Sequence, residues 1–395
     1  MSGMGNVLPT YYEFFAGGGM ARAGLGLNWN CVFANDIDPM KAAAYARNWG
    51  DQHLLCGDVA DVATSSLPGR ADLAWASFPC QDLSLAGGSA GLGDVTAEAT
   101  TRSGTFWPFW ALMRRLRTEG RPPRMVVLEN VYGMLTSQAG RDFAAICRAL
   151  STNGYQFGAV VIDAVHFVPQ SRQRVFFIAV DCDCILPEGL TEKAPSRIWH
   201  PPALVAAYLK LPTEAREQWL WWSFPRPPTR TTVFADLIED EPTGVAWHTV
   251  DQTRVLLGIM SPINLSKIEQ AKTSGRRIVG GVYRRTRPDG KGGKMQRAEI
   301  RFDDVSGCLR TPGGGSSRQT VLIVDGDVVR SRLLSPREAA RLMGLPEEYR
   351  LPLRYNDAYH LAGDGVCVPV VSHLSKTLLQ PVVSLNQRLL CEAAE

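Results

Sequence analysis

A short apolar run from Leu73 to Ser77 ends at a proline, and it restricts the fold more than any other part of the chain. Continuous apolar residues between Asp72 and Pro79 are typical of a buried strand in a parallel sheet. Because proline has no N–H for the sheet ladder, the chain must leave the sheet there. Cys80 therefore follows the carboxyl end of a central strand, the edge where open α/β sheets bind substrates. The sequence predicts an α/β doubly wound fold with a candidate nucleophile at this edge.

The residues after Cys80 bear on two interpretations of that cysteine. An isolated cysteine is more often a small buried residue than a reactive one. Here polar Gln81, Asp82 and Ser84 follow at once, and residues 84–104 are small and rich in glycine. Such a segment favours a loop that closes over a substrate, with a disordered connector as the alternative.

Three strand ends in the first part of the chain predict a cofactor site. The run from Val7 to Phe15 is followed by glycines at 17, 18 and 19, which let backbone amides approach a ligand closely. Asp36 ends the next strand, at the spacing of roughly 20 residues expected for an acid that holds a ribose. Asp58 ends a third strand, a place from which it can accept a hydrogen bond from an adenine amino group. Solvated strand ends are the alternative, but three in register favour an adenosyl cofactor.

Two further strands carry charged residues at their ends. The strand from Met125 to Leu128 is followed by Glu129, which places a second functional group one strand away from the candidate nucleophile. Arg172 and Arg174 alternate as the chain enters another apolar strand, so we expect both side chains on one face. Two arginines in this arrangement suit an oxygen-rich ligand or an acidic partner, with a solvated strand end as the alternative.

The alternation of strands and helices stops near Cys182, which predicts a second, smaller domain that is mostly β or irregular. Between Arg276 and Arg301 lie nine Lys or Arg and only two acids, interleaved with Tyr283 and glycines. This stretch predicts a phosphate-contacting surface, with a solvated basic face as the alternative. The aromatic run at 219–222 is interpreted as a buried strand rather than a platform for stacking bases.

Composition sets the remaining bounds. Hydrophobic residues make up 45% of the chain and the net charge is +3, which is typical of a globular protein with a sizeable core. A basic leader and a long uncharged apolar run are both missing, so neither secretion nor membrane spanning is expected. The nine cysteines are scattered without paired CxxC spacings, which predicts no zinc site and reduced thiols in a cytosol.

The order of these motifs resembles that of DNA (cytosine-5)-methyltransferases of the bacterial restriction-modification type. FFAGGG, NDIDP, GDV, FPCQDLS, ENV, QSRQR, SPREAARLMGLP and GDGVCVPVV follow one another over nearly the whole chain, apart from the basic region. The resemblance implies a Rossmann-like domain that binds S-adenosylmethionine (SAM) at 1–183, completed by 360–395. It also implies a target-recognition domain at 184–332, and a helix and loop returning to the first domain at 333–359.

The resemblance also implies roles for individual residues. Cys80 would add to carbon 6 of a cytosine flipped out of duplex DNA, with Glu129, Arg172 and Arg174 as further catalytic residues. The implied SAM contacts are Phe15, Ala16, Gly17, Gly19, Asp36, Ile37, Asp58, Val59, Pro79, Phe106, Asp364 and Gly365. The candidate DNA contacts are Gln81, Ser84, Arg284, Arg285, Arg287, Ser316 and Arg318. No metal is implied.

Two positions depart from the family pattern, and neither belongs to the catalytic set. Asp364 stands where an asparagine is usual, and Asp36 stands where a glutamate is commoner. An RNA cytosine-5 methyltransferase of the tRNA-modifying branch remains an alternative, as does an inert DNA-binding relative. A methyltransferase for exocyclic amines would need a loop such as DPPY, which the sequence lacks. We expect a monomer near the nucleoid of a bacterial cytoplasm, with a restriction endonuclease or defence-system proteins as possible partners.

Overall fold

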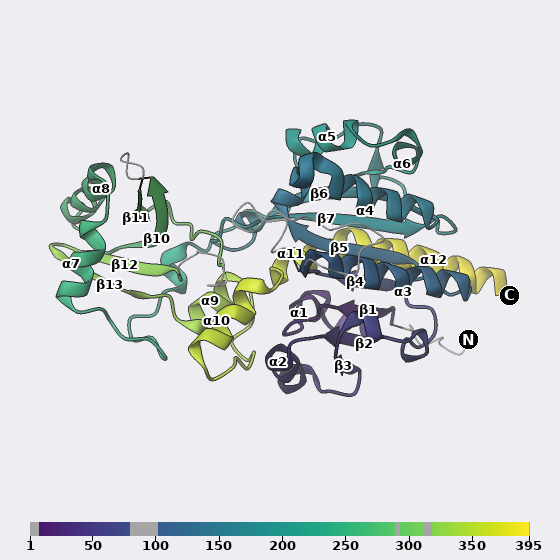
Figure 1. Ribbon diagram of the computed structural model, residues 1–395, viewed down its shortest axis with the longest axis horizontal. Helices are drawn as coiled ribbons and strands as arrows, with labels where there is room; N and C mark the ends of the chain where they lie inside the picture. The colour runs from purple at the N-terminus through teal and green to yellow at the C-terminus, as the bar shows by residue number, and fades with distance from the viewer. Residues whose placement is uncertain (1–7, 80–101, 289–292, 311–317, 395) are drawn as a thin grey trace. The chain divides into compact units, whose positions relative to one another are not determined.

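The computed structural model describes residues 8–79, 102–288, 293–310 and 318–394. The chain divides into two compact units (Figure 1). The first unit consists of Met1–Ile162, Gln173–Pro227 and Val366–Glu395, and the second of Asp163–Arg172 and Pro228–Gly365. The chain therefore passes between the units four times.

The first unit is built on a seven-stranded sheet with the order β3-β2-β1-β4-β5-β7-β6. Its strands are β1 (Thr10–Phe14), β2 (Asn30–Asp36), β3 (Leu54–Cys56), β4 (Leu73–Ala76), β5 (Met125–Val131), β6 (Tyr155–Asp163) and β7 (Gln173–Asp181). Neighbours from β3 to β5 pair in parallel, whereas β7 runs antiparallel to β5. The predicted α/β doubly wound class is confirmed, and the direction of β7 is a feature that the sequence analysis did not predict.

Helices complete the first unit around this sheet. They are α1 (Met20–Leu25), α2 (Pro39–Trp49), α3 (Phe106–Thr118), α4 (Arg141–Thr152), α11 (Val368–Leu374) and α12 (Gln380–Ala394). Asp38 caps α2 by accepting hydrogen bonds from the backbone N–H groups of Met40 and Lys41, and Pro39 follows it at the first helical position. The aromatic core between helix and sheet includes Phe14 and Phe109, whose ring centroids lie 5.0 Å apart.

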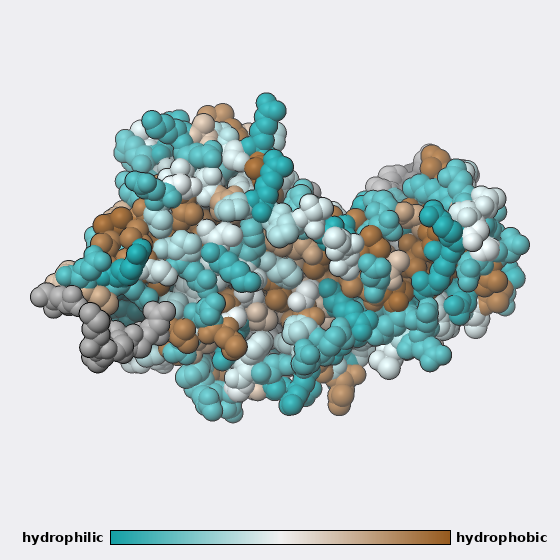
Figure 2. Space-filling model, turned by 180° about the vertical axis from the view of Figure 1, so that it is seen from behind, coloured by the Kyte–Doolittle hydropathy of each residue, from teal (hydrophilic) through white to brown (hydrophobic). Residues whose placement is uncertain are grey.

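The C-terminal helices belong to this core. Between α11 and α12 the chain makes a π-helical turn at Ser375–Leu379, where the Ser375 hydroxyl accepts a hydrogen bond of 2.9 Å from Trp29 Nε1. The helices from Tyr355 to Glu392 include a stretch long and apolar enough to cross a membrane, but 61% of it is buried inside the protein. On the face drawn in Figure 2, hydrophobic residues form small separate patches among hydrophilic ones.

The predicted start of the second domain at residue 184 is wrong, because residues 173–227 belong to the first unit. This segment contains β8 (Thr191–Glu192), α5 (Pro202–Leu209), α6 (Thr213–Glu217) and β9 (Trp221–Trp222). It lies along the edge of β6, where the Phe157 N–H donates to Gln218 O and the Leu220 N–H donates to Phe157 O. An apolar, tryptophan-rich segment covers the sheet edge, which satisfies backbone groups that would otherwise be open. The interpretation of the aromatic run as a buried strand is confirmed.

The second unit is built on a four-stranded antiparallel sheet with the order β11-β10-β12-β13. Its strands are β10 (Ile278–Pro288), β11 (Lys294–Arg301), β12 (Thr320–Asp325) and β13 (Val328–Leu333). Two helices, α7 (Val250–Gly258) and α8 (Pro262–Thr273), pack their apolar residues on this sheet (Figure 1). The unit is therefore more helical than the sequence predicted.

The end of the second unit contains α9 (Pro336–Leu342) and α10 (Tyr355–Asp364). Ser335 and Glu338 form a capping box at the start of α9. Glu338 also forms a fully buried ion pair with Arg332 of β13, at 2.6 Å. Because residues 333–365 belong to the second unit, the boundaries predicted at 332 and 360 are wrong, and the first unit resumes at Val366.

The covering of β6 leads to a stability prediction for Gly158. A Cβ atom added there would lie 1.9 Å from the carbonyl oxygen of Leu220, a backbone atom that cannot move without breaking the edge pairing. We expect Gly158→Ala to lower the free energy of unfolding by about 3 kcal/mol or more, measured by urea titration. Gly57→Ala, where the added Cβ meets nothing within 4 Å, is the control and should cost little. Equal stability of the two variants would contradict the prediction.

Candidate active site

The order of the strands places the candidate site. Strand β1 lies between β2 and β4, so the chain builds the sheet in one direction from β1 and then in the other. Open α/β sheets bind their ligands at such a switch point, outside the carboxyl ends of the strands. The glycine turn after β1 and the Pro79 segment after β4 both leave the sheet at this edge, since β1 and β4 are parallel.

The turn after β1 has a backbone that few side chains tolerate. Phe15, Gly17 and Gly19 all have positive φ angles, of 54°, 57° and 73°. A positive φ at a phenylalanine costs free energy and is typical of functional sites. A Cβ atom added to Gly17 would meet nothing within 4 Å, so the turn faces open space there. The carbonyl of Gly18 is fixed from the other side by Trp49 Nε1, at 3.0 Å.

Asp36 connects this turn to the end of β2. Its Oδ2 accepts a hydrogen bond from the Gly17 N–H at 2.7 Å, and its Oδ1 accepts one from the Asp38 N–H at 2.9 Å. The side chain is 7% exposed, and burial raises the pKa of its carboxyl group. The short side chain thus holds two backbone turns in place, and each oxygen keeps a lone pair for a ligand hydroxyl.

Glu13 is a residue of this site that the sequence analysis missed. It lies in β1, only 1% exposed, and its Oε1 accepts a hydrogen bond from the Arg22 N–H of α1 at 3.4 Å. Its Oε2 is buried and accepts no hydrogen bond from the described residues. Burial raises the pKa of the carboxyl group to about 8. A carboxylate inside the apolar run YYEFF was the available sequence signal, since buried acids rarely lack a function.

The other predicted cofactor residues lie in varied environments. Ile37 is 62% exposed, Asp58 is exposed and caps Ala60 N–H, and Val59 is buried. Ala16 is buried and Pro79 is half-buried, whereas the exposed Asp364 and half-buried Gly365 lie at the end of α10 in the second unit.

Phe106, a predicted cofactor contact, lies in the aromatic core. Its ring is fully buried and stacks on Trp110 with an interplanar angle of 14°, while Phe78 covers it from another side.

Glu129 and Arg174 meet across β5 and β7. The antiparallel register pairs Val131 with Arg174, so Glu129, two residues earlier in β5, presents its side chain on the same face. Arg174 Nε lies 3.0 Å from Glu129 Oε1, and both side chains are largely buried. The structure therefore brings together two of the predicted catalytic side chains. Glu129 lies within the strand and not after it, because β5 continues to Val131.

Asn130 anchors the segment that leads to Cys80. Its side-chain amide donates to the carbonyl of Phe78 at 3.2 Å, two residues before Cys80, and its Oδ1 accepts from Val131 N–H. Asn130, the residue after Glu129, therefore holds the backbone at Phe78, where the segment that leads to Cys80 begins. Cys80 itself lies outside the described residues, as do Gln81, Ser84, Ser316 and the predicted closing loop up to residue 101.

The structure gives Arg172 and Arg174, which were expected on one face, different partners. Strand β7 begins at Gln173, so the alternation of side chains does not extend to Arg172. Arg172 lies in the second unit, 2% exposed, and donates hydrogen bonds to backbone carbonyl groups. Its side chain is engaged by the protein, unlike that of a free anion-binding group.

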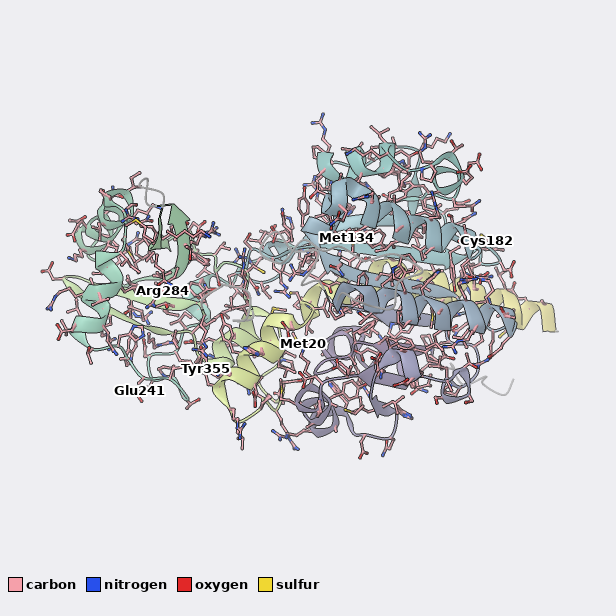
Figure 3. All side chains as sticks on the ribbon, in the orientation of Figure 1. Met20, Met134, Cys182, Glu241, Arg284 and Tyr355 are labelled. Atoms are coloured by element: carbon pink, nitrogen blue, oxygen red, sulfur yellow. The ribbon has the colours of Figure 1, made fainter. Side chains whose placement is uncertain are left out.

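The predicted DNA contacts that are described lie in the second unit. Arg284 (labelled in Figure 3) and Arg285 are exposed on β10, and Arg285 lies 3.6 Å from Glu299 on β11. Arg287 is part of the same strand. Arg318 is half-buried, and its guanidinium lies over the ring of Tyr355.

Comparison with known families gives a match over most of the chain. Residues 10–380 match the family of C-5 cytosine-specific DNA methylases. The chain is 26% identical to the type II methyltransferase M.HpaII of Haemophilus parainfluenzae, covering 95% of this chain and 90% of that protein. It is 24% identical to the type II methyltransferase M.HhaI of Haemophilus parahaemolyticus, covering 92% of each.

Solved structures with the same fold include the Dnmt2 methyltransferase of S. pombe. It matches 96% of this chain and 99% of its own, with a TM-score of 0.58 and 17% identity. A putative DNA modification methyltransferase encoded within an E. coli prophage matches 95% of this chain and 99% of its own, with a TM-score of 0.52 and 16% identity. At these identities the two structures support the fold alone.

Glu13 makes the stability of the ligand-free protein depend on pH. Between its ordinary pKa of 4.5 and about 8, the folded state holds a proton that the unfolded state has lost. This contribution is fully present at low pH and is lost as pH rises through 8. We expect Glu13→Gln to gain stability relative to the original protein as pH rises from about 5 to about 9. Urea titration at each pH measures this, and a constant difference would contradict a raised pKa.

Proposed function

Because the chain belongs to the C-5 cytosine-specific DNA methylase family, we propose that it methylates carbon 5 of cytosine in a specific duplex DNA sequence, with SAM as methyl donor. The observation that carries the proposal is the arrangement at the end of β5. There the Glu129–Arg174 pair stands beside Asn130, which holds the segment leading to Cys80. A carboxylate paired with a guanidinium, at the end of the strand next to the one that leads to Cys80, suits chemistry on a cytosine ring.

The residues at the switch point fit SAM. Open space at Gly17, a strained turn at Phe15 and the carboxylate of Asp36 suit a ligand with a ribose and a charged amino-acid end. Bound SAM supplies an electrophilic methyl group. The proposed contacts are the turn residues together with Asp36, Ile37, Asp58 and Val59.

Cys80 makes carbon 5 reactive. Its thiolate forms a bond to carbon 6, the ring electrons shift to give an enamine, and nitrogen 3 takes a proton from the carboxyl group of Glu129. Arg174 binds the ring carbonyl oxygen, where negative charge develops. Once carbon 5 has taken the methyl group, its proton passes to a water molecule that acts as the base, the carbon 5–carbon 6 double bond re-forms and the thiolate leaves. The proton on nitrogen 3 returns to Glu129, so every group on the protein is restored.

The second unit supports a role in holding DNA. Arg284 and Arg285 on β10 belong to the basic hairpin of β10 and β11, and exposed arginines suit contact with phosphates. The target cytosine must leave the duplex, since carbon 6 is covered by stacking.

The biological setting proposed is restriction-modification or phage defence in a bacterial cytoplasm. The relatives M.HpaII and M.HhaI are named type II methyltransferases, and the E. coli structure is described as encoded within a prophage. A cognate endonuclease or defence-system protein is the proposed partner, and the enzyme is proposed to act as a monomer.

A transfer assay tests the reaction and the nucleophile together. The purified protein receives labelled SAM with either mixed-sequence duplex DNA or bulk tRNA. We expect label in DNA as 5-methylcytosine, and a loss of at least about 1,000-fold in Cys80→Ala because the enamine no longer forms. Cys182→Ala, which removes an exposed free thiol, is the matched control and should keep its activity. Label in tRNA alone would select the RNA alternative, and no transfer to either would favour an inert relative.

Asn130 gives a finer test of how the cysteine segment is held. Asn130→Ala removes the hydrogen bond to Phe78 O, worth about 1.4 kcal/mol, which corresponds to about tenfold. We expect kcat to fall by roughly that factor with SAM binding unchanged, since Asn130 contacts the segment and not the glycine turn. Equilibrium binding of labelled SAM and steady-state kinetics measure the two quantities. A loss of SAM affinity with unchanged kcat would contradict the assignment.

A further inference from the structure

The chain passes between the two units at Ile162/Asp163, Arg172/Gln173, Pro227/Pro228 and Gly365/Val366. Arg172 is the last residue before one of these passages. Its backbone N–H donates to Asp163 Oδ1 at 2.8 Å, and its carbonyl accepts from Ala164 N–H at 3.0 Å. The passage at Asp163 is therefore tied to the passage at Arg172.

The guanidinium of Arg172 reaches a third passage. Its Nη2 donates to the carbonyl oxygens of Gly363 at 3.0 Å and Gly365 at 2.7 Å. Gly363 lies in the last turn of α10, the helix that begins at Tyr355 (labelled in Figure 3), and Gly365 follows the helix as the last residue before Val366. All of these atoms belong to the second unit.

The second terminal nitrogen of the Arg172 guanidinium, Nη1, also has acceptors within the protein. Nη1 donates to Leu309 O at 3.2 Å and lies 3.4 Å from Cys308 Sγ. An arginine has five N–H donors, of which four are on the two terminal nitrogens. Those four have acceptors within the protein, and the remaining Nε is buried. A side chain used in this way has no terminal donor left for a cytosine.

We propose that Arg172 is a positioning residue that holds three of the four chain passages together at one point, and that Arg174 alone serves the cytosine. The inference rests on the proposed function, since it divides a predicted pair of catalytic arginines into two roles. Only a planar guanidinium presents donors on two sides at this spacing, so a lysine cannot replace it.

Hydrogen exchange on the full chain tests the positioning role without any need for activity. We expect Arg172→Lys to speed amide exchange by about tenfold or more in peptides that span 308–310 and 363–366, because four hydrogen bonds are lost. Exchange in β4 and β12 should stay unchanged. Arg174→Lys is the matched control: it carries the same substitution two residues away and should leave exchange at 363–366 as it was.

Kinetics separate positioning from catalysis. The Arg172→Lys variant loosens the segments that contact residue 172, and binding of DNA can restore their order. We therefore expect this variant to raise KM for DNA by about tenfold and to keep kcat within about threefold. Arg174→Lys should lower kcat instead. A fall in kcat equal to that of Arg174→Lys, with exchange at 363–366 unchanged, would overturn the proposal.

Two further outcomes are decisive. Absence of methyl transfer by the original protein would count against the proposed function, while the exchange result would still decide the role of Arg172. If Arg172→Lys unfolds, Asp163→Ala tests the same cluster from its other side, because it removes the acceptor of both Arg172 N–H and Val165 N–H. Unchanged exchange in the peptides that span 308–310 and 363–366 would then reject the proposal.

Discussion

The parallel pairing of β1 with β4 is the constraint on which the candidate site depends. Register fixes Phe14 opposite Ala76, so the turn after β1 and the segment before Cys80 leave the sheet at the same level. Strand β5 pairs with β4 on the other side and carries Glu129 and Asn130. Three loops of quite different sequence therefore serve one edge, because parallel strands end together.

Antiparallel β7 adds what parallel strands alone would not provide. A strand that enters the sheet at this edge brings its first residues, and not its last, next to the end of β5. Arg174 can therefore pair with Glu129, and the strand then continues into the core with Val175 to Val180 buried. The same reversal places Arg172 just outside the sheet, at a passage between units, where its donors serve backbone carbonyls.

Buried polar groups fix the local geometry within each unit. Glu13 accepts a hydrogen bond from the Arg22 N–H at the start of α1, and Arg172 donates to the Gly365 carbonyl. Arg332 of β13 forms an ion pair with Glu338 of α9. Such groups add little net stability, since desolvation offsets much of their attraction, but they specify one arrangement of the segments they join. That use fits a protein whose proposed site is assembled from distant parts of the chain.

The sequence by itself determined the class of sheet and the approximate positions of the strands that carry the candidate site, because these depend on local apolar runs, glycines and prolines. It also singled out Glu129 and Arg174 through their motifs. It could not give the unit boundaries at 227 and 365, since edge covering by residues 218–220 depends on strands brought together from afar. Only the tertiary structure separated Arg172 from Arg174 and located Phe106 in the core. The environments of these residues depend on burial and on hydrogen bonds between distant parts of the chain. Neither produces a periodic pattern in the sequence from which it could be predicted.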